Sequence, residues 1–235
     1  MRPIWGKPAV EINVEGKRWI LIADLHIGYE MELTNRGVYV PDQSSRMLER
    51  ILSLGRASGL FIAGDLKHSI SLFPSSRIKG FLAKLSQHFE RVEVVQGNHD
   101  GGLQNLVGRG FIVHGTRGVP LDDVWIFHGH AYPHEESSSY DFGIMGHVHP
   151  SISLRGIGRV PVWVVGDSSC DNLPRTIILV PAFNELVGYG DILNPSDSGP
   201  VFPKCFDPDS TDVLTLEGEY IGTLSFLISR GKLIY

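Results

Sequence analysis

The sequence has few cysteines and no long apolar run, and each absence excludes a class of protein. Cys170 and Cys205 are its two cysteines, too few for a disulfide framework or a cysteine-rich zinc motif. We therefore expect two free thiols in a reducing compartment. No apolar stretch approaches the ~20 residues of a membrane-spanning helix, and the N-terminus lacks a secretory signal pattern. These absences predict a cytoplasmic protein with no membrane partner.

Runs of basic residues are also missing. The formal net charge is −5 and the isoelectric point is about 6.0, unlike a protein whose main task is to coat nucleic acid. This balance does not exclude a nuclease, because bound metal cations add local positive charge. The composition is otherwise that of an ordinary globular protein, and we expect a single domain over residues 1–235.

The first half of the chain alternates strand and helix patterns. Residues 10–14 alternate apolar and polar side chains, whereas residues 17–23, 59–63 and 92–95 are apolar runs typical of strands buried on both faces. Between these runs we expect a helix that begins near Asp42 and a second helix over residues 78–89. This alternation predicts an α/β fold with mostly parallel pairing.

The second half has a different pattern. Short strands are expected at residues 124–127, 142–145, 152–154, 160–165, 176–180 and 224–228. Few helical stretches separate them, which favours antiparallel β-structure. Residues 191–212 are rich in proline, aspartate and serine and are predicted to form a long surface loop.

Residues able to bind metals follow five of these strands directly. They are Asp24 and His26, then Asp65, then Asn98, His99 and Asp100, then His128, and finally His147 and His149. Ligands of open α/β sheets bind outside the carboxyl ends of the strands, so we expect these side chains to meet. Their mixed nitrogen and oxygen donors suit Mn²⁺, Fe, Zn²⁺ or Ni²⁺.

Such a donor set indicates a defined chemistry. A carboxylate such as Asp65 can bridge two cations, and cations ~3.5–4 Å apart clamp the attacking and leaving oxygens of an in-line displacement. They also lower the pKa of bound water from ~15.7 toward 7, which yields hydroxide at neutral pH. A protonated histidine nearby can protonate the leaving oxygen.

Five short motifs resemble, in order, those of the calcineurin-like metallophosphoesterases. They are Asp24-Leu25-His26, Gly64-Asp65, Gly97-Asn98-His99-Asp100, His128-Gly129-His130 and Gly146-His147-Val148-His149. The resemblance implies a four-layer α/β/β/α fold, in which two mixed sheets form a sandwich flanked by helices. It also implies two divalent metal ions, with Mn²⁺ favoured.

The resemblance further implies a role for each motif residue. One metal is expected on Asp24, His26, Asp65 and His149, and the other on Asp65, Asn98, His128 and His147. His99 is expected to be the general acid or phosphate contact, with Asp100 orienting it and Asn98 stabilising charge. The family pattern favours His128 over His130 as the ligand, and whether His130 supports the site stays open.

Within this superfamily the chain is similar to the SbcD-related phosphoesterases of archaea and to bacterial PdeM-type enzymes found with DNA-ligase and helicase genes. Residues 26–30, 37–41 and 181–184 carry that likeness. It implies a DNA or RNA substrate and a helicase or ligase association. Protein Ser/Thr phosphatases are a poorer match, because Leu66-Lys67-His68-Ser69 follows Asp65 where they continue into Asp-Arg-Gly.

The sequence thus predicts a two-metal phosphodiesterase, with two alternatives left open. A small-molecule phosphatase or cyclic-nucleotide phosphodiesterase needs the same metal site, and a non-catalytic metal-binding scaffold can keep the fold. Several other residues are expected to be ordinary core or surface groups. They are His68, His88, His114, His134, Arg36, Arg46, Arg117, Asn184 and the tryptophans 5, 19, 125 and 163.

Overall fold

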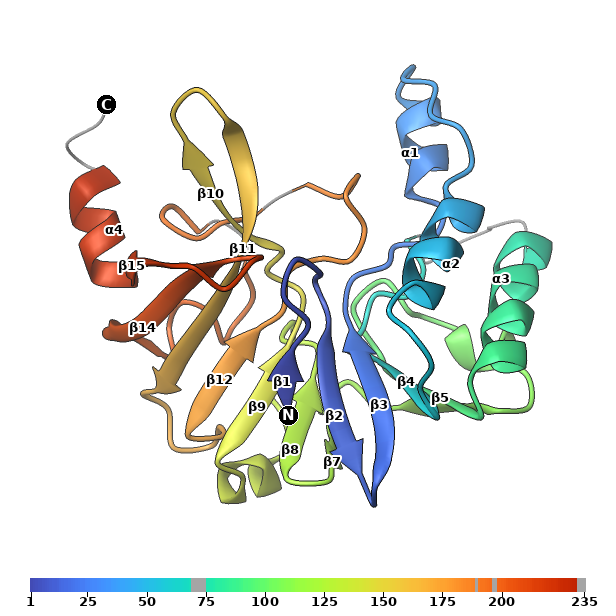
Figure 1. Cartoon of the computed structure of the whole chain (residues 1–235), viewed down its shortest axis with the longest axis horizontal. Helices are drawn as coiled ribbons and strands as arrows, with labels where there is room; N and C mark the ends of the chain where they lie inside the picture. The colour runs from blue at the N-terminus through green and yellow to red at the C-terminus, as the bar shows by residue number, and fades with distance from the viewer. Residues whose placement is uncertain (69–74, 189, 196–197, 232–235) are drawn as a thin grey trace.

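The computed structural model describes residues 1–68, 75–188, 190–195 and 198–231, and these form two mixed β-sheets with a few helices (Figure 1). The first sheet has six strands in chain order. They are β1 (Arg2–Pro3), β2 (Val10–Val14), β3 (Lys17–Ile22), β4 (Gly59–Ile62), β5 (Arg91–Val95) and β6 (Phe111–His114). Pairing is antiparallel from β1 to β3 and parallel from β3 to β6.

The second sheet has nine strands, seven of them in the order β13-β10-β11-β12-β9-β8-β7, while β14 pairs with β11 and β15 with β14. Their bounds are β7 (Val119–Leu121), β8 (Val124–Phe127), β9 (Phe142–Met145), β10 (Pro150–Leu154), β11 (Gly158–Ser168), β12 (Thr176–Leu179), β13 (Gly190–Asp191), β14 (Phe206–Thr215) and β15 (Tyr220–Thr223). Strand β9 runs parallel to both β8 and β12, so the antiparallel prediction holds for only part of this sheet.

In the described residues, four α-helices accompany the sheets. They are α1 (Tyr29–Asn35), α2 (Ser44–Leu52), α3 (Ser75–His88) and α4 (Leu224–Gly231), with 3₁₀ turns at Leu103–Asn105 and Glu135–Ser139. Helices α2 and α3 lie on the outer face of the first sheet, because Met47, Ile51 and Phe81 share one buried cluster with its strands. No helix in the described part of the chain has the length and apolar character needed to cross a membrane.

The strands of the first sheet are buried on both faces, as their continuous apolar runs predict. In β3, Ile20 and Ile22 face the helices, whereas Leu21 faces the second sheet. Strand β4 repeats this division, with Ile62 on the helix side and Phe61 between the sheets. Each such side chain contributes about 1.5–3 kcal/mol when fully buried. The two sheets therefore pack against each other through a shared layer of buried side chains.

Two predictions about the C-terminal third are wrong. Residues 224–228 form helix α4 instead of a strand, with Leu224, Leu227 and Ile228 packed on one side. Thr223 Oγ1 accepts a hydrogen bond from Phe226 N at 3.2 Å and caps the first turn. A short apolar run cannot distinguish a strand from a buried helix by itself.

The predicted surface loop at residues 191–212 is wrong at its two ends, because β13 includes Asp191 and β14 begins at Phe206. Strand β14 pairs with β11 on both sides of a bulge, since Ser168 faces Phe206 but Gly166 already faces Thr211. The Pro- and Asp-rich residues 207–210 form that bulge. The turn-forming residues that suggested a loop therefore form a bulge inside strand β14.

The two cysteines form a disulfide, so the prediction of free thiols is wrong. They lie 35 residues apart in sequence, but the pairing of β11 with β14 brings their Cα atoms to 5.2 Å. Ser169 N donates to Cys205 O at 2.9 Å beside the bridge. The disulfide also removes the free-thiol argument for a reducing compartment. Among the tryptophans, Trp5 is 51% exposed, whereas Trp19, Trp125 and Trp163 are buried as predicted.

We expect removal of the disulfide to lower the free energy of unfolding by about 2–4 kcal/mol, because the bridge restricts the unfolded chain. The measurement is urea unfolding of the wild type and of Cys170→Ser/Cys205→Ser, each with and without dithiothreitol. The reductant should affect only the wild type. Two reactive thiols in denatured, unreduced wild-type protein would show that the bridge does not form.

Candidate metal centre

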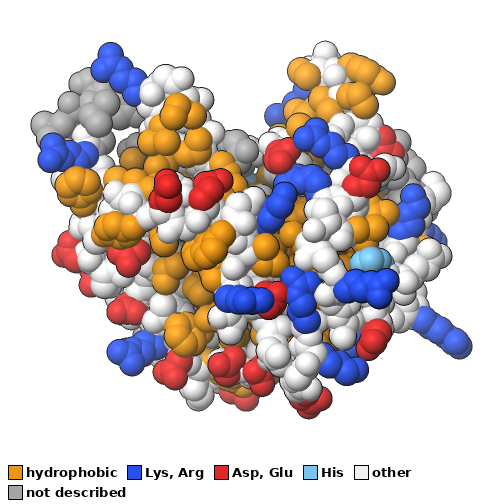
Figure 2. Space-filling model, in the orientation of Figure 1, with side chains coloured by type: hydrophobic (Ala, Val, Ile, Leu, Met, Phe, Trp, Pro, Cys, Tyr) orange, Lys and Arg blue, Asp and Glu red, His pale blue; other side chains and the backbone are white. Residues whose placement is uncertain are grey.

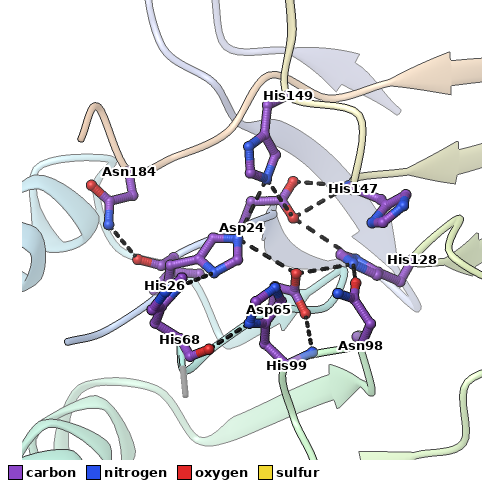
Figure 3. Close-up of polar contacts among 12 residues, drawn as sticks. Asp24, His26, Asp65, His68, Asn98, His99, His128, His147, His149 and Asn184 are labelled. Atoms are coloured by element: carbon purple, nitrogen blue, oxygen red, sulfur yellow. Dashed lines mark hydrogen bonds and ion pairs between the residues drawn. The ribbon is translucent and has the colours of Figure 1, made fainter. Parts of the chain in front are cut away.

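The predicted ligands lie at one edge of the structure, where the carboxyl ends of β3, β4, β5, β8 and β9 meet (Figure 3). The backbone there is unusual. Five of the seven described non-glycine residues with positive φ are at this edge, namely Asp24, His26, Asp65, His147 and His149. Such conformations cost free energy and persist at sites where side chains must point inward.

One half of the site combines Asp24, His26 and His149, whose ligand atoms all lie within 4.8 Å of one another. His149 Nε2 is 3.4 Å from Asp24 Oδ1 and 3.4 Å from His26 Nε2. Asp24 also accepts hydrogen bonds from the backbone amide of His147 at 3.1 and 3.2 Å. These bonds tie the end of β3 in the first sheet to the end of β9 in the second.

The other half combines Asp65, His128 and His147, again within 4.8 Å. Asp65 Oδ2 lies 3.3 Å from His128 Nε2, and Asn98 Oδ1 lies 3.3 Å from the same nitrogen. Asp65 is also close to the first half, because its Oδ2 is 3.4 Å from His26 Nε2. One carboxylate oxygen therefore stands between the two groups.

Two glycines allow these carboxylates to approach the backbone closely. A Cβ on Gly97 would lie 2.1 Å from Asp65 Oδ1, and a Cβ on Gly146 would lie 2.7 Å from Asp24 Oδ2. Any other residue at either position would displace a carboxylate.

Backbone carbonyls orient two of the histidines. His128 Nδ1 is 2.9 Å from Ala63 O, and His149 Nδ1 is 2.9 Å from Gly188 O. A carbonyl only accepts, so each Nδ1 donates and each Nε2 faces the centre of the site. This is the usual way in which a protein sets the tautomer of a metal-binding histidine.

The electrostatics are those of buried carboxylates among imidazoles. Asp24 is 0% and Asp65 is 2% exposed, and burial by itself would raise both pKa values. His149 and His128 outweigh burial at Asp24, and His128 and His26 do so at Asp65, so both pKa values lie below the ordinary range. Both groups are therefore anionic at neutral pH.

The histidines divide into two groups by pKa. Burial lowers the pKa of His26 to about 3, and burial together with His128 lowers that of His147 to about 4. Burial also disfavours the charged form of His128, but Asp65 and Asp24 outweigh it and raise its pKa to about 9. The pKa of His149 is likewise raised, because Asp24 and its other neighbours outweigh burial. A protonated His128 ring thus accompanies the two carboxylates at neutral pH.

These residues fit divalent cations. The donors are carboxylate oxygens, imidazole Nε2 atoms and one amide oxygen, a set typical of borderline first-row metals. Glycines leave space for the carboxylates, and carbonyls aim the rings inward. The structure places all seven predicted ligands close together. Their roles as ligands stay predictions.

The structure places Asp100 differently from the expected role. Its carboxylate is fully buried and accepts from the backbone amides of Gly97, Leu66 and Lys67 at 3.0–3.3 Å. It therefore joins the loops after β4 and β5. His99 is held by other groups, since its Nδ1 meets the carbonyl of His68, its amide donates to Asp65 and Lys67 Nζ donates to its carbonyl.

His68 also belongs to this site, although the sequence patterns predicted an ordinary core or surface residue. Its ring stacks on His99 with centroids 5.0 Å apart, and its Nδ1 is 3.2 Å from His26 Nδ1. With His26 and His99 it forms a third group close enough to hold a cation. The available signal was its position three residues after Asp65, at the end of a buried strand.

The structure also gives defined places to His130, whose role the sequence left open, and to Asn184, which was expected to be an ordinary residue. The His130 ring lies 5.2 Å from that of His128 and 6.1 Å from that of His147, so it borders the site. Asn184 is structural, because its Nδ2 donates to Leu25 O and its Oδ1 accepts from Leu186 N.

Metal binding should release protons. At neutral pH the His128 ring is protonated, and its Nε2 is the predicted metal donor, so a bound cation would displace that proton. The apparent affinity for Mn²⁺ should therefore rise with pH up to about 9. The same raised pKa stabilises the metal-free fold below about 6.5, and this contribution is lost as pH rises through about 9.

Calorimetric titration in buffers of different ionisation enthalpy counts the released protons. His88→Ala, which alters an exposed ring on α3, should leave the count unchanged. An affinity independent of pH between about 7 and 9 would contradict the assignment of His128.

Comparison with known proteins shows a shared fold. The structure resembles that of the nuclease MPE from Pseudomonas putida with a TM-score of 0.52, over 89% of this chain and 97% of that chain. Sequence identity is 20%, so the likeness concerns the fold alone. No protein-family profile and no curated protein sequence matches the chain. The arrangement of two mixed sheets is thus one that this chain has in common with a nuclease.

Proposed function

We propose that this protein is a metal-dependent phosphodiesterase. The observation that carries the proposal is the place of Asp65, whose Oδ2 lies 3.4 Å from His26 Nε2 and 3.3 Å from His128 Nε2. A carboxylate oxygen between two histidine-containing groups is what two adjacent cations require. The shared fold with a nuclease supports phosphodiester bonds as the target.

Each half of the site would hold one cation. Asp24, His26 and His149 would form the first with Asp65, and Asn98, His128 and His147 the second with Asp65. When bound, two divalent cations neutralise phosphate charge and lower the pKa of water. The chain's own part is to keep the carboxylates ionised and the rings turned inward, as their pKa values and carbonyl contacts indicate.

His99 is the proposed proton donor to the leaving oxygen. Its Nδ1 faces the carbonyl of His68, so Nε2 is the nitrogen available to substrate. The ring is only partly buried, and the His99 amide is bound to Asp65 at 2.9 Å. This bond keeps the ring beside the bridging carboxylate, where a phosphate would lie.

Two segments that follow site residues in the chain shape the surface on this side of the molecule. Helix α1 begins three residues after His26, and β10 begins directly after His149. Both segments project from the body of the molecule, α1 on one side and the β10–β11 hairpin on the other (Figure 1). The surface between these projections is hollowed (Figure 2), which favours a nucleic-acid strand over an enclosed small molecule.

The finer sequence-based interpretations stay part of this proposal. They are membership of the SbcD-related or PdeM-type branch, the four-layer form of the sandwich, a single domain over residues 1–235 and a cytoplasmic location. The choice of Mn²⁺ and an association with a helicase or ligase belong with them.

The test is hydrolysis of bis-p-nitrophenyl phosphate and of p-nitrophenyl phosphate, first in EDTA and then with Mn²⁺, Fe²⁺, Zn²⁺ or Ni²⁺ restored. We expect metal-dependent cleavage of the diester and little cleavage of the monoester. Asp65→Asn should abolish activity and metal binding together, because the shared carboxylate is lost. Asp122→Asn is the matched control, since Asp122 also has positive φ but is exposed. Preference for the monoester would favour the small-molecule phosphatase, and no turnover with any metal would favour the scaffold.

We expect His99→Ala to lower kcat by about 10²–10⁴-fold while both metals remain bound. The loss should be larger for a dinucleotide than for bis-p-nitrophenyl phosphate, because an alkoxide leaving group needs the proton more. Metal content by mass spectrometry and kcat for both substrates are the measurements, with His88→Ala as the control. An equal loss on both substrates, or a missing metal, would contradict the role of proton donor.

A further inference from the structure

A chain of side chains leads from the surface helix α1 to the candidate metal centre. Arg36 forms an ion pair with Glu32 one helical turn away, and Glu32 Oε2 contacts His68 Nε2. His68 Nδ1 lies 3.2 Å from His26 Nδ1 (Figure 3). The far nitrogen of His26, Nε2, faces Asp65 and His149 at 3.4 Å each.

The order of donors and acceptors in this chain is determined at its outer end. The Glu32 carboxylate can only accept, so His68 Nε2 must carry a proton. The contact between the two Nδ1 atoms needs one donor and one acceptor, and with His68 Nδ1 as the acceptor, His26 Nδ1 donates to it. His26 therefore keeps its lone pair on Nε2, which is the nitrogen that faces the site.

The group that orients His26 is a side chain, whereas the groups that orient His128 and His149 belong to the backbone. His128 and His149 donate to backbone carbonyls, of Ala63 and Gly188, which no side-chain substitution removes. The orientation of His26 depends on a side chain of α1. The His68 ring is further held by Tyr29, also on α1, with ring centroids 4.7 Å apart, and by stacking on His99.

We propose that Glu32 is a positioning residue that acts through His68 to hold His26 in its Nδ1–H tautomer and so sets the metal affinity of the Asp24, His26 and His149 half. The carbonyl of His68 also contacts His99 Nδ1, so His68 orients the proposed proton donor His99 as well. The inference rests on the proposed function only in taking His26 as a metal ligand. The tautomer itself is a property of the metal-free protein.

The first experiment is long-range ¹H–¹⁵N correlation NMR of the histidine rings in the metal-free wild-type protein. We expect His26 to carry its proton on Nδ1 and His68 to carry its proton on Nε2. A His26 proton on Nε2 would overturn the proposal whether or not the protein hydrolyses diesters. This measurement needs no variant, so it does not depend on how a substitution affects folding.

The second experiment compares Mn²⁺ binding by Glu32→Ala, Glu32→Gln and the wild type. Loss of a partner that orients a ligand typically weakens metal affinity by about 10–100-fold, and we expect that loss in one of two binding steps for Glu32→Ala. Glu32→Gln keeps an acceptor oxygen and should restore most of the affinity. Glu49→Ala removes an exposed carboxylate from α2 and is the matched control.

The outcomes separate the inference from the proposed function. Equal affinities for Glu32→Ala and Glu49→Ala would refute the positioning role. So would a third Mn²⁺ bound by His26, His68 and His99 in the wild type, because His68 Nδ1 would then face a cation. Weakened binding by Glu32→Ala in a protein that cleaves neither ester would uphold the relay and reject the phosphodiesterase.

Discussion

The burial of two carboxylates where two sheets meet is the constraint on which this site depends. Asp24 and Asp65 have almost no exposed surface, and an uncompensated charge in such a place costs several kcal/mol. The backbone amides of His147 and His99 and the surrounding imidazoles supply the compensation. The strained left-handed backbone and the glycines beside the carboxylates follow from the need to bring these groups together.

Two kinds of hydrogen-bond partner orient the histidine rings of the site. Carbonyls at the ends of other segments orient His128 and His149, and a relay through His68 orients His26. The relay starts on α1, one of the two segments that project beside the hollow (Figure 1). This helix is thereby linked to a predicted metal ligand, and through the His68 carbonyl to His99.

Much of the structure and the composition of the site could be predicted from local patterns. Apolar runs identified β3, β4, β5, β8 and β9, and the polar residues after each run identified the side chains that meet. This succeeded because strands buried on both faces have a simple pattern, and because parallel strands place their carboxyl ends at one edge. Residues 224–228 failed, since a short apolar run is compatible with either a strand or a helix.

The sequence by itself determined the buried strands of the first sheet and the residues available for chemistry at their ends. Only the tertiary structure decided that Cys170 bonds to Cys205, that Asp100 joins two loops and that His68 and Glu32 serve the site. The reason is physical. Burial and backbone preference act on neighbouring residues, so they leave a local pattern in the sequence. These contacts join segments that are far apart in the chain, and no local pattern shows that such segments lie close together in space.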